Sequence, residues 1–404
     1  MDFDQRYITN IHDFGYDKSK AKDRLVEFSQ DRPIGLVLPV AYGEVEQRTL
    51  PRILSELNKA TFLNEVNVAL YARSRDEFAK VTRLFKILEI PHRIIWCNSP
   101  SIKVILDDLQ QEGIDINMQG KGRDIWLAMG AASLNSYALV MHDSDIVNYS
   151  YELPMRMAYP LVNPDLDYFF NKGYYTRIGG DPPKFYGRTA RLFVRPLIES
   201  LMIKTGHSID FLRYIRSFKY PLSGEIAMTK DLALNIRTTM DWGLEVGTLY
   251  EVYRSAAKKR ICQTDLGFFE HKHQEVGSSR SEGLLKMAGD ILITLLRALS
   301  EEEGVEISTD FLRSLRVLYN RRSQGNIRQY YTDAVCNQLS YNRHEEESMV
   351  EFFEQIIMDA GREYLCNPQQ AQIPDWLRAS SAIPNLRTKL IETALEDERS
   401  VQEG

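Results

Sequence analysis

Short apolar runs alternate with helical segments over the first third of the chain, and this alternation limits the possible folds more than any other feature. The runs are partly β-branched and occupy residues 34–40, 66–71, 92–97 and 137–142. Helical spacing of apolar residues fills the intervals at 46–60, 76–89 and 101–134, with a break near 113–122. Strands that alternate with helices at this distance form βαβ units. The sequence therefore predicts an α/β fold with a mixed, mainly parallel sheet, whose ligands bind outside the carboxyl ends of the strands.

The fourth apolar run ends in two aspartates. Asp143 and Asp145 flank Ser144 at the expected carboxyl end of the strand. Two neighbouring carboxylates repel one another unless a cation lies between them, and hard divalent metal ions prefer oxygen ligands. In nucleotide-sugar transferases an Asp-x-Asp at this position binds Mg²⁺ or Mn²⁺, which holds the diphosphate and acts as a Lewis acid. The plain alternative is a solvated pair in which one aspartate caps the next turn.

A second chemistry fits the same two aspartates. Haloacid-dehalogenase-type phosphatases present a nucleophilic aspartate and an acid/base aspartate after an apolar strand, in the pattern D-x-D-x-V. In that case Asp143 would be phosphorylated and Asp145 would transfer the proton. Those enzymes place the motif on an early strand, whereas about 140 residues precede it here. The position therefore favours the metal site over the phosphatase.

Two glycine-containing segments indicate anion binding. Lys121 lies between two glycines just before a helix, where a cation and backbone N–H groups suit a phosphate. Gly187 precedes another helix, whose first turn carries Arg188, Thr189 and Arg191. The helix dipole and these donors favour a bound anion. Each segment also fits an ordinary solvated loop or a solvated basic face.

Three further residues are candidates for metal or sugar contacts. His271 and His273 stand two apart at the end of a predicted strand, so both side chains project to one face. One of them can complete a metal site with Asp145, and a pair of surface histidines is the alternative. Glu245 lies between glycines at the start of a helix. It either complements the helix dipole or binds a sugar.

Composition limits the partners and the location. The 404 residues include 50 Lys and Arg against 56 Asp and Glu, and the net charge of −6 argues against a nucleic-acid partner. The first residues are polar and acidic, without the pattern of a secretory signal, and no apolar stretch reaches the roughly 18 residues of a membrane helix. The four cysteines are scattered and suggest neither a zinc site nor a disulfide framework. We expect a cytoplasmic protein that binds no membrane.

The order of the motifs resembles that of the glucosyl-3-phosphoglycerate synthases, which are retaining glycosyltransferases of the GT-A fold. The likeness runs from about residue 39 to about residue 299 and rests on LVMHDSDI, NKGYYTR, GRTAR, LSGEIAM, WGLEVGTLYEVY and LGFFEHKH. The resemblance implies metal-dependent transfer of glucose from UDP- or GDP-glucose to the 2-hydroxyl of 3-phosphoglycerate, with retention, as the first step towards the compatible solute glucosylglycerate. A mannosyl-3-phosphoglycerate synthase or another GT-A osmolyte synthase is the nearest alternative.

The resemblance also implies roles for individual residues. Asp145 and His271 would bind the metal, Mg²⁺ or Mn²⁺, and Glu245 would bind glucose hydroxyls, so that Asp145 and Glu245 carry the catalytic assignments. The donor-binding set would be Pro39, Ala41, Glu44, Lys121, Asp143, Ser144, Gly224 and Glu225, and the acceptor-binding set Arg177, Gly187, Arg188, Thr189 and His273. The loop PVAYGE departs from the family's usual Asn-Glu-Glu ending, and His273 stands where an asparagine is expected.

The same resemblance and the helical pattern of the last hundred residues predict the domain organisation. A GT-A domain would span residues 1–300, with its nucleotide-binding part at about 30–148 and its acceptor-binding part at about 149–300. Residues 301–404 would form a helical C-terminal extension that packs on the catalytic domain or makes a homodimer.

Overall fold

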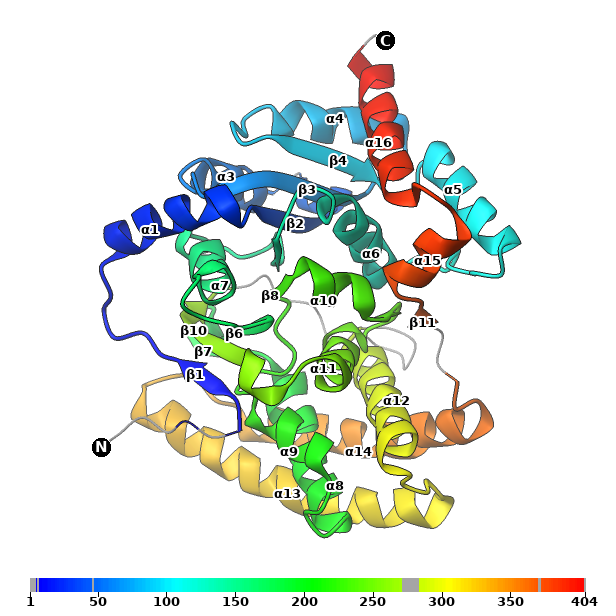
Figure 1. Ribbon diagram of the computed structural model, residues 1–404. Helices are drawn as coiled ribbons and strands as arrows, with labels where there is room; N and C mark the ends of the chain where they lie inside the picture. The colour runs from blue at the N-terminus through cyan, green and yellow to red at the C-terminus, as the bar shows by residue number, and fades with distance from the viewer. Residues whose placement is uncertain (1–4, 6, 46, 271–282, 370–371, 403–404) are drawn as a thin grey trace.

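A mixed β-sheet runs through the molecule, and the four strands expected near the N-terminus are all present in it (Figure 1). The computed structural model describes residues 5, 7–45, 47–270, 283–369 and 372–402. The strands are β1 (Thr9–Ile11), β2 (Ile34–Ala41), β3 (Leu63–Tyr71), β4 (His92–Trp96), β5 (Ala138–Met141), β6 (Phe170–Gly179), β7 (Lys184–Phe185), β8 (Ile226–Thr229), β9 (Thr238–Thr239), β10 (Ile261–Phe269) and β11 (Gln372–Ile373).

The order of the strands in the large sheet is β1-β10-β6-β8-β5-β2-β3-β4, and β7 pairs with β6. Strand β8 runs antiparallel to both β5 and β6, whereas the other neighbours along this order are parallel. A separate antiparallel pair joins β9 to β11. The predicted α/β class with a mixed, mainly parallel sheet is confirmed.

The helices follow the expected segments closely. They are α1 (Lys18–Asp31), α2 (Tyr42–Val45), α3 (Thr49–Leu57), α4 (Arg75–Phe85), α5 (Pro100–Gln111), α6 (Lys121–Ala132), α7 (Glu152–Val162), α8 (Arg195–Lys204), α9 (Asp210–Ser217), α10 (Lys230–Asn235), α11 (Leu244–Ser255), α12 (Gly283–Glu303), α13 (Thr309–Cys336), α14 (Arg343–Cys366), α15 (Trp376–Ala382) and α16 (Leu386–Gln402), with a π-helical turn η1 (Thr189–Val194) and a 3-10 turn η2 (Lys258–Arg260). The expected break near residues 113–122 separates α5 from α6.

Apolar side chains on the two faces of the sheet form two hydrophobic groups. Leu36 and Leu38 of β2 join the group that includes α1, α3, α4 and α7, whereas Val37 joins the group that includes α5, α6 and the later helices. Alternate residues of a strand point to opposite faces, so both faces of β2 are covered. Burial on both faces explains why β2 and β5 read as nearly continuous apolar runs.

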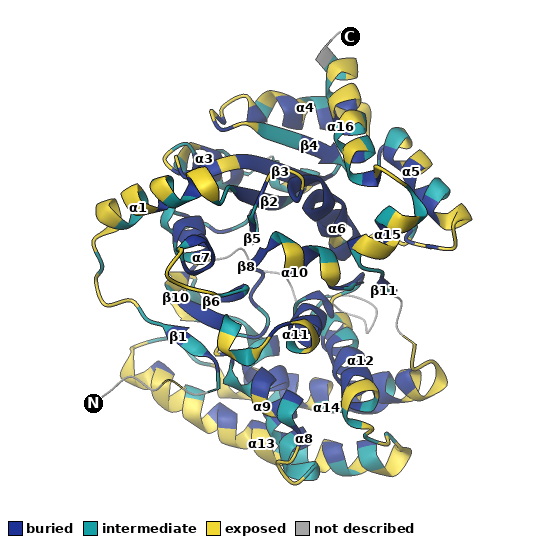
Figure 2. Ribbon diagram, in the orientation of Figure 1, coloured by how far each residue is buried: buried dark blue, intermediate teal, exposed yellow. Residues whose placement is uncertain are grey.

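Helix α6 is buried along its whole length after its first residue (Figure 2). It packs on β2 and β3 on one side and on α16 and β9 on another. The indole rings of Trp126 in α6 and Trp376 in α15 stack with centroids 3.8 Å apart. Each indole N–H also donates across this contact, Trp126 to the carbonyl of Pro374 and Trp376 to the carbonyl of Trp126, both at 3.0 Å. The C-terminal segment is therefore part of the fold around the sheet.

The last helices reach both ends of the molecule. Figure 1 shows α16 beside β4 and α4, while α13 and α14 lie at the opposite end, next to α8. The carboxylate of Glu398 in α16 accepts a hydrogen bond at 2.8 Å from the backbone N–H of Ile94 in β4. Within the described ranges, no helix combines the length and the apolar composition needed to cross a lipid bilayer.

Two segments that follow α7 take a definite form in the structure. The segment 166–179 contains the single long strand β6, which pairs with the short β7. The helix expected after Gly187 begins as the π-helical turn η1, continues as α8 and ends at Lys204, just before Gly206. Gly206 has φ of +64°, a left-handed conformation that favours glycine and ends helices.

Candidate active site

The carboxyl ends of β5 and β6 and the first turns of α6 and α11 meet at one cavity of about 380 Å³. This is the edge of the sheet at which an α/β fold binds its ligands. Eight of the predicted site residues line the cavity, namely Lys121, Asp143, Asp145, Arg177, Gly187, Arg188, Thr189 and Glu245. Segments as far apart in sequence as residues 121 and 245 are thus brought to one place.

One side of the cavity is acidic around a single lysine. The Lys121 ammonium lies 2.6 Å from a carboxylate oxygen of Asp143 and 3.8 Å from one of Glu245. Burial alone would lower the pKa of Lys121, but the charges of Asp143 and Glu245 outweigh it and hold the pKa above its usual value. Burial raises the pKa of Glu245, and the nearby Lys121 and Lys172 oppose this rise. The lysine therefore stays charged and ties the start of α6 to the aspartate after β5.

Gly224 is placed where a side chain would collide with Asp143. A Cβ atom at position 224 would lie 2.7 Å from the Oδ2 atom of Asp143. Atoms at that distance overlap, so the segment before β8 can approach the aspartate this closely only because residue 224 is glycine. Gly224 does not line the cavity, but its lack of a side chain leaves Asp143 room to face it.

The cavity also has a basic wall, which includes Arg177 and Arg188. Burial alone would lower the pKa of Arg177, yet the phenol groups of Tyr220 and Tyr175 hold it above its usual value, and Arg177 donates to the Tyr220 hydroxyl at 3.4 Å. The Nε of Arg177 and the Oγ1 of Thr189 are buried and have no hydrogen-bond partner among the described residues. Buried polar groups rarely stay unpaired, so these two atoms suit a bound polar ligand.

Arg188 is engaged by carboxylates from a distant helix. It donates to Glu345 at 2.7 Å and to Glu346 at 2.9 Å, both in the first turn of α14. Glu346 also accepts from Arg191 at 2.7 Å. Arg188 thus lines the cavity as predicted, but in this structure its guanidinium is already paired, which the sequence pattern around Gly187 did not indicate.

The remaining predicted donor residues are not among those that line the cavity. The Ser144 hydroxyl donates to the carbonyl of Pro39 at 2.8 Å and also to the carboxylate of Glu44. Burial raises the pKa of Glu44 to about 7, and the charges of Asp145 and Asp143 add to this rise. Ala41 is exposed at the end of β2, and Glu225 is fully buried at the start of β8. Strand β2 and the short helix α2 therefore both contact the Asp-x-Asp segment through Ser144.

Of the two predicted metal ligands, Asp145 lies within the described residues, and Asp143 of the same motif lines the cavity beside it. His271, the further predicted ligand, and His273, the predicted acceptor contact, lie outside the described residues. Within the described ranges, no group of three or more His, Cys, Asp or Glu side chains is arranged to hold a metal ion. Two carboxylates on a cavity wall are nevertheless the hard oxygen donors that Mg²⁺ and Mn²⁺ prefer, so the residues present fit the predicted ion.

His142, beside Asp143, has its two ring nitrogens engaged elsewhere. One contacts the carbonyl oxygen of Asp143 and the other the hydroxyl of Tyr149, both at 2.9 Å. Burial lowers the pKa of His142 to about 4. This neutral histidine therefore fixes the backbone at the end of β5.

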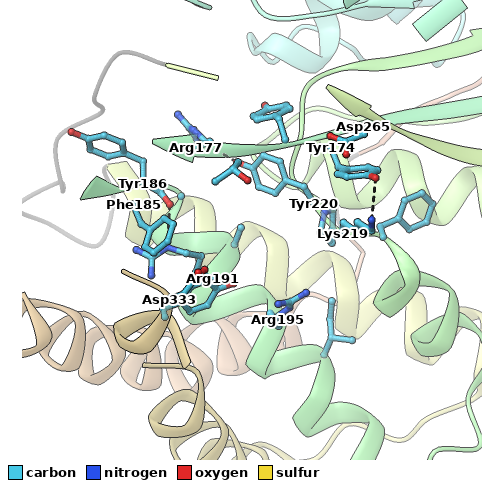
Figure 3. A pocket seen from close by; sticks show the side chains of 18 of the residues that line it. Tyr174, Arg177, Phe185, Tyr186, Arg191, Arg195, Lys219, Tyr220, Asp265 and Asp333 are labelled. Carbon is cyan, nitrogen blue, oxygen red and sulfur yellow. Dashed lines mark hydrogen bonds between the residues drawn. The ribbon is translucent and has the colours of Figure 1, made fainter. Parts of the chain in front are cut away.

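A larger cavity of about 510 Å³ adjoins the first, and the two share Arg177, Tyr186 and Tyr220 among their lining residues. Figure 3 shows Arg177 and Tyr186 on one side of it, with Lys219 and Tyr174 on the other. The Lys219 ammonium donates to the Tyr174 hydroxyl at 3.0 Å. Arg177 and Tyr220 thus form part of the wall between the two cavities.

Comparison with known proteins assigns the chain to a family. No family model matches it, but two curated relatives match along their whole length. The glucosyl-3-phosphoglycerate synthase of Methanococcoides burtonii is 48% identical over 398 residues, and that of Persephonella marina is 37% identical over 400 residues, with 98% of each chain covered in both cases. The chain belongs to the glucosyl-3-phosphoglycerate synthase family.

Solved structures of this family show the same fold. A glucosyl-3-phosphoglycerate synthase from Mycobacterium tuberculosis, in complex with Mn²⁺, uridine-diphosphate-glucose and phosphoglyceric acid, matches 75% of this chain and 89% of its own, with a TM-score of 0.54 at 20% identity. At this identity the likeness concerns the fold, and it confirms the GT-A assignment. Membership in the family also favours a transferase over the phosphatase that an Asp-x-Asp motif allows.

One residue near the site escaped the sequence reasoning. Lys172 lies near the start of β6 and is fully buried, and its ammonium donates to the carbonyl of Ser223 at 2.7 Å. The charges of Glu245 and Glu225 act on it. A lysine among the buried residues of a strand is the signal that could have identified it, because a buried charge needs a partner. In this family member Lys172 stands behind the acidic side of the cavity.

Proposed function

We propose that the chain transfers glucose from a nucleoside diphosphate glucose to 3-phosphoglycerate, and that a divalent metal ion is required. The observation that carries this proposal is the single cavity with an acidic wall at Asp143, Asp145 and Glu245 and a basic wall at Arg177 and Arg188. The whole-length relatives named glucosyl-3-phosphoglycerate synthase support the same reaction. A metal-bound diphosphate suits the acidic wall, and a small phosphorylated acid suits the basic one.

The acidic wall would hold the donor. Asp143 and Asp145 would hold Mg²⁺ or Mn²⁺, which supplies charge neutralisation to the leaving diphosphate when bound. Lys121 is oriented by Asp143 and carries a positive charge at the mouth of the donor site. Glu245, 20% exposed in its side chain and within ion-pair distance of Lys121, would accept hydrogen bonds from glucose hydroxyls. These roles position the sugar between the two walls.

The basic wall would hold the acceptor. Thr189 and Arg177 offer buried groups that have no protein partner in the described residues. Arg188 would bind the acceptor's anionic group by exchanging one of its two carboxylate contacts for it. Each hydrogen bond to a charged group contributes roughly 1.5 to 3 kcal/mol, so a few such contacts select phosphoglycerate over neutral glycerol.

Finer features of the reaction belong to the same proposal. Transfer would occur to the 2-hydroxyl of 3-phosphoglycerate with retention of the anomeric configuration, as the first step towards glucosylglycerate. The protein would work in the cytoplasm as a homodimer. Exposed apolar residues on the outer helices, Val317 and Val335 of α13 and Phe352 of α14, offer a surface for the second subunit. Light scattering after gel filtration measures the oligomeric state directly.

The reaction is tested by release of the nucleoside diphosphate. Purified protein is incubated with UDP-glucose or GDP-glucose and Mg²⁺ or Mn²⁺, with and without 3-phosphoglycerate, and with EDTA as a control. We expect release to require acceptor and metal together. Binding of a donor without release would point to another acceptor, and absence of donor binding would contradict the transferase assignment.

The metal role of the Asp-x-Asp motif is tested by Asp145→Ala. We expect this variant to lose metal-dependent turnover and to keep a normal circular dichroism spectrum, because the side chain borders the cavity. Asp115→Ala, at an exposed position in the loop after α5, is the matched control. Near-normal turnover by Asp145→Ala would remove the metal hypothesis.

A further inference from the structure

A polar cavity of about 620 Å³ lies away from the active site, between α12 and the start of α15. Three arginines line it, Arg237, Arg297 and Arg378, together with the acids Glu301 and Asp375. Nothing in the transfer reaction uses this cavity. Its lining comes from the region before β9, from α12 and from the C-terminal segment, so it joins parts of the chain that are far apart in sequence.

Arg297 is the central residue of this cavity. It is 8% exposed, and its Nε and Nη2 atoms are buried without a hydrogen-bond partner among the described residues. The carboxylate of Glu301 is 4.0 Å from Nε, which is too far for a hydrogen bond. Burial lowers the pKa of Arg297, as expected for a charge with little compensation. The two N–H groups form one edge of the guanidinium, the edge that binds a carboxylate or a phosphate through two parallel hydrogen bonds.

A second donor borders the same cavity from another segment. The Nε2 atom of Gln372, in β11, is also buried and has no hydrogen-bond partner in the described part of the chain. Native proteins leave few buried polar groups unpaired, and each such group needs an explanation. Donors without acceptors on α12 and on β11, in two residues that line one cavity, indicate a ligand that supplies acceptors.

The acids of this cavity are already engaged by other groups. Glu301 pairs with Arg237 at 3.1 Å and with Arg254 at 3.6 Å. Asp375 accepts a hydrogen bond at 2.9 Å from the backbone N–H of Arg378, as the N-cap of α15. These acids therefore do not occupy the donor edge of Arg297. We propose that the cavity binds a small oxyanion, a phosphate or carboxylate group, through Arg297 and Gln372.

The position of this site connects it to Lys121 in the candidate active site. Strand β11 pairs with β9, and the carbonyl oxygens of Thr239 and Met240 lie against the start of α6. A Cβ atom at Gly122 would be 2.1 Å from the first of these oxygens, and one at Gly120 would be 2.5 Å from the second. An oxyanion that links Arg297 to Gln372 therefore holds β11 in place beside the segment that carries Lys121.

The test measures the binding of inorganic phosphate at constant ionic strength to the full chain and to Arg297→Met. Isothermal titration and the shift of the thermal transition give the affinity and the stabilisation. We expect the wild type to gain stability with phosphate concentration and Arg297→Met to bind at least about tenfold more weakly, because two charge-assisted hydrogen bonds are lost. Phosphate bound in the active site affects both proteins equally. Any difference between them in phosphate affinity or in thermal shift therefore comes from the proposed site at Arg297. Arg362→Met, at an exposed position on α14, is the control.

The stability of the ligand-free proteins shows whether Arg297 serves to bind a ligand or to stabilise the fold. Removing a poorly compensated buried charge costs little, so Arg297→Met should unfold in phosphate-free buffer at a temperature equal to or above that of the wild type. Gln372→Leu, which keeps the arginine, should also weaken phosphate binding. A parallel titration with acetate shows whether a carboxylate is accepted as well.

Hydrogen exchange provides a structural readout of the same proposal. Phosphate should slow the exchange of the amides of Gln372 and Ile373 in the wild type and leave them unchanged in Arg297→Met. Identical phosphate effects on the wild type and both variants would overturn the proposal. A marked loss of stability in ligand-free Arg297→Met, without any change in phosphate affinity, would show that the arginine is structural.

Discussion

Arg188 is held by the carboxylates of Glu345 and Glu346, which follow it in the chain by 157 and 158 residues. An incoming anionic substrate must compete with these carboxylates for the guanidinium. We predict that Arg188→Ala raises the KM for 3-phosphoglycerate at least about tenfold and changes the KM for the sugar nucleotide little, because it removes an anion contact and no metal ligand. Initial rates with each substrate varied in turn measure both constants. Equal increases in the two KM values would show that the acceptor side is assigned wrongly.

Lys172 makes the stability depend on pH in a defined direction. Burial lowers its pKa to about 8, although Glu245 and Glu225 act in the opposite direction, whereas a lysine in an unfolded chain has a pKa of about 10.4. Between these values the unfolded chain binds more protons, so this group makes the free energy of unfolding rise with pH, by up to about 1.4 kcal/mol per unit. We predict that Lys172→Met removes this rise. Urea unfolding at pH 8.5 and 9.5 measures the change in the free energy of unfolding between the two pH values. The same change in the wild type and in Lys172→Met would contradict the prediction.

The sequence identified candidate site residues where a short local pattern indicates their chemistry, and the structure brings several of them to one cavity. Asp143 and Asp145 after an apolar strand, and Gly187 with Arg188 and Thr189 before a helix, were found because strand ends and helix starts can be recognised from a few neighbouring residues. The pairing of Arg188 with Glu346 and the burial of Arg297 depend on how α12 and α14 pack. Such contacts join residues far apart in the chain, and no local pattern encodes them.

At the scale of elements, the stacked indoles of Trp126 and Trp376 join α6 to α15. Gly130 in α6 lies against the ring of Trp376, and a Cβ atom at this glycine would be 2.0 Å from the Cζ2 atom of the indole. We predict that Gly130→Ala lowers the free energy of unfolding by about 1 to 3 kcal/mol, because the ring must move out of a packed site. Urea unfolding followed by circular dichroism measures the change.

Gly325→Ala is the matched control for this helix contact. Gly325 also lies inside a helix, α13, but no atom is within 4 Å of the position of its missing Cβ. Alanine there should raise the free energy of unfolding by about 0.5 to 1 kcal/mol through helix propensity. If both variants change the free energy of unfolding in the same direction and by the same amount, the indole contact does not restrict the size of the side chain at residue 130.

At the scale of the whole molecule, the C-terminal segment shares one hydrophobic group with helix α6. Ile373, Trp376, Leu386 and Leu390 belong to the group that also contains Trp126. The local sequence indicated helices here but not the surface on which they pack, because amphipathic spacing shows which face is apolar and not what covers it. The division of the chain near residue 300 stays a prediction.

We predict that removing residues 372–404 lowers the stability of the entire protein. The deletion uncovers the indole of Trp126 and takes the Glu398 carboxylate from the backbone of β4. The truncated chain should unfold at a lower urea concentration than the full chain, in both far-ultraviolet circular dichroism and tryptophan fluorescence. An unchanged transition would mean that the segment is dispensable for the fold.

The stacked indoles also determine how long one face of α6 stays uncovered while the chain is being synthesised. Trp376 is synthesised 250 residues after its partner in α6, which at 5 to 20 residues per second corresponds to roughly 10 to 50 s on the ribosome. Throughout that interval the outer face of α6 has no tryptophan to cover it. The sheet and its helices can assemble early, but the nascent protein carries an open apolar surface until its final helices emerge. A chaperone that binds apolar surfaces would therefore find this face of α6 exposed only until α15 and α16 have been synthesised and have packed against it.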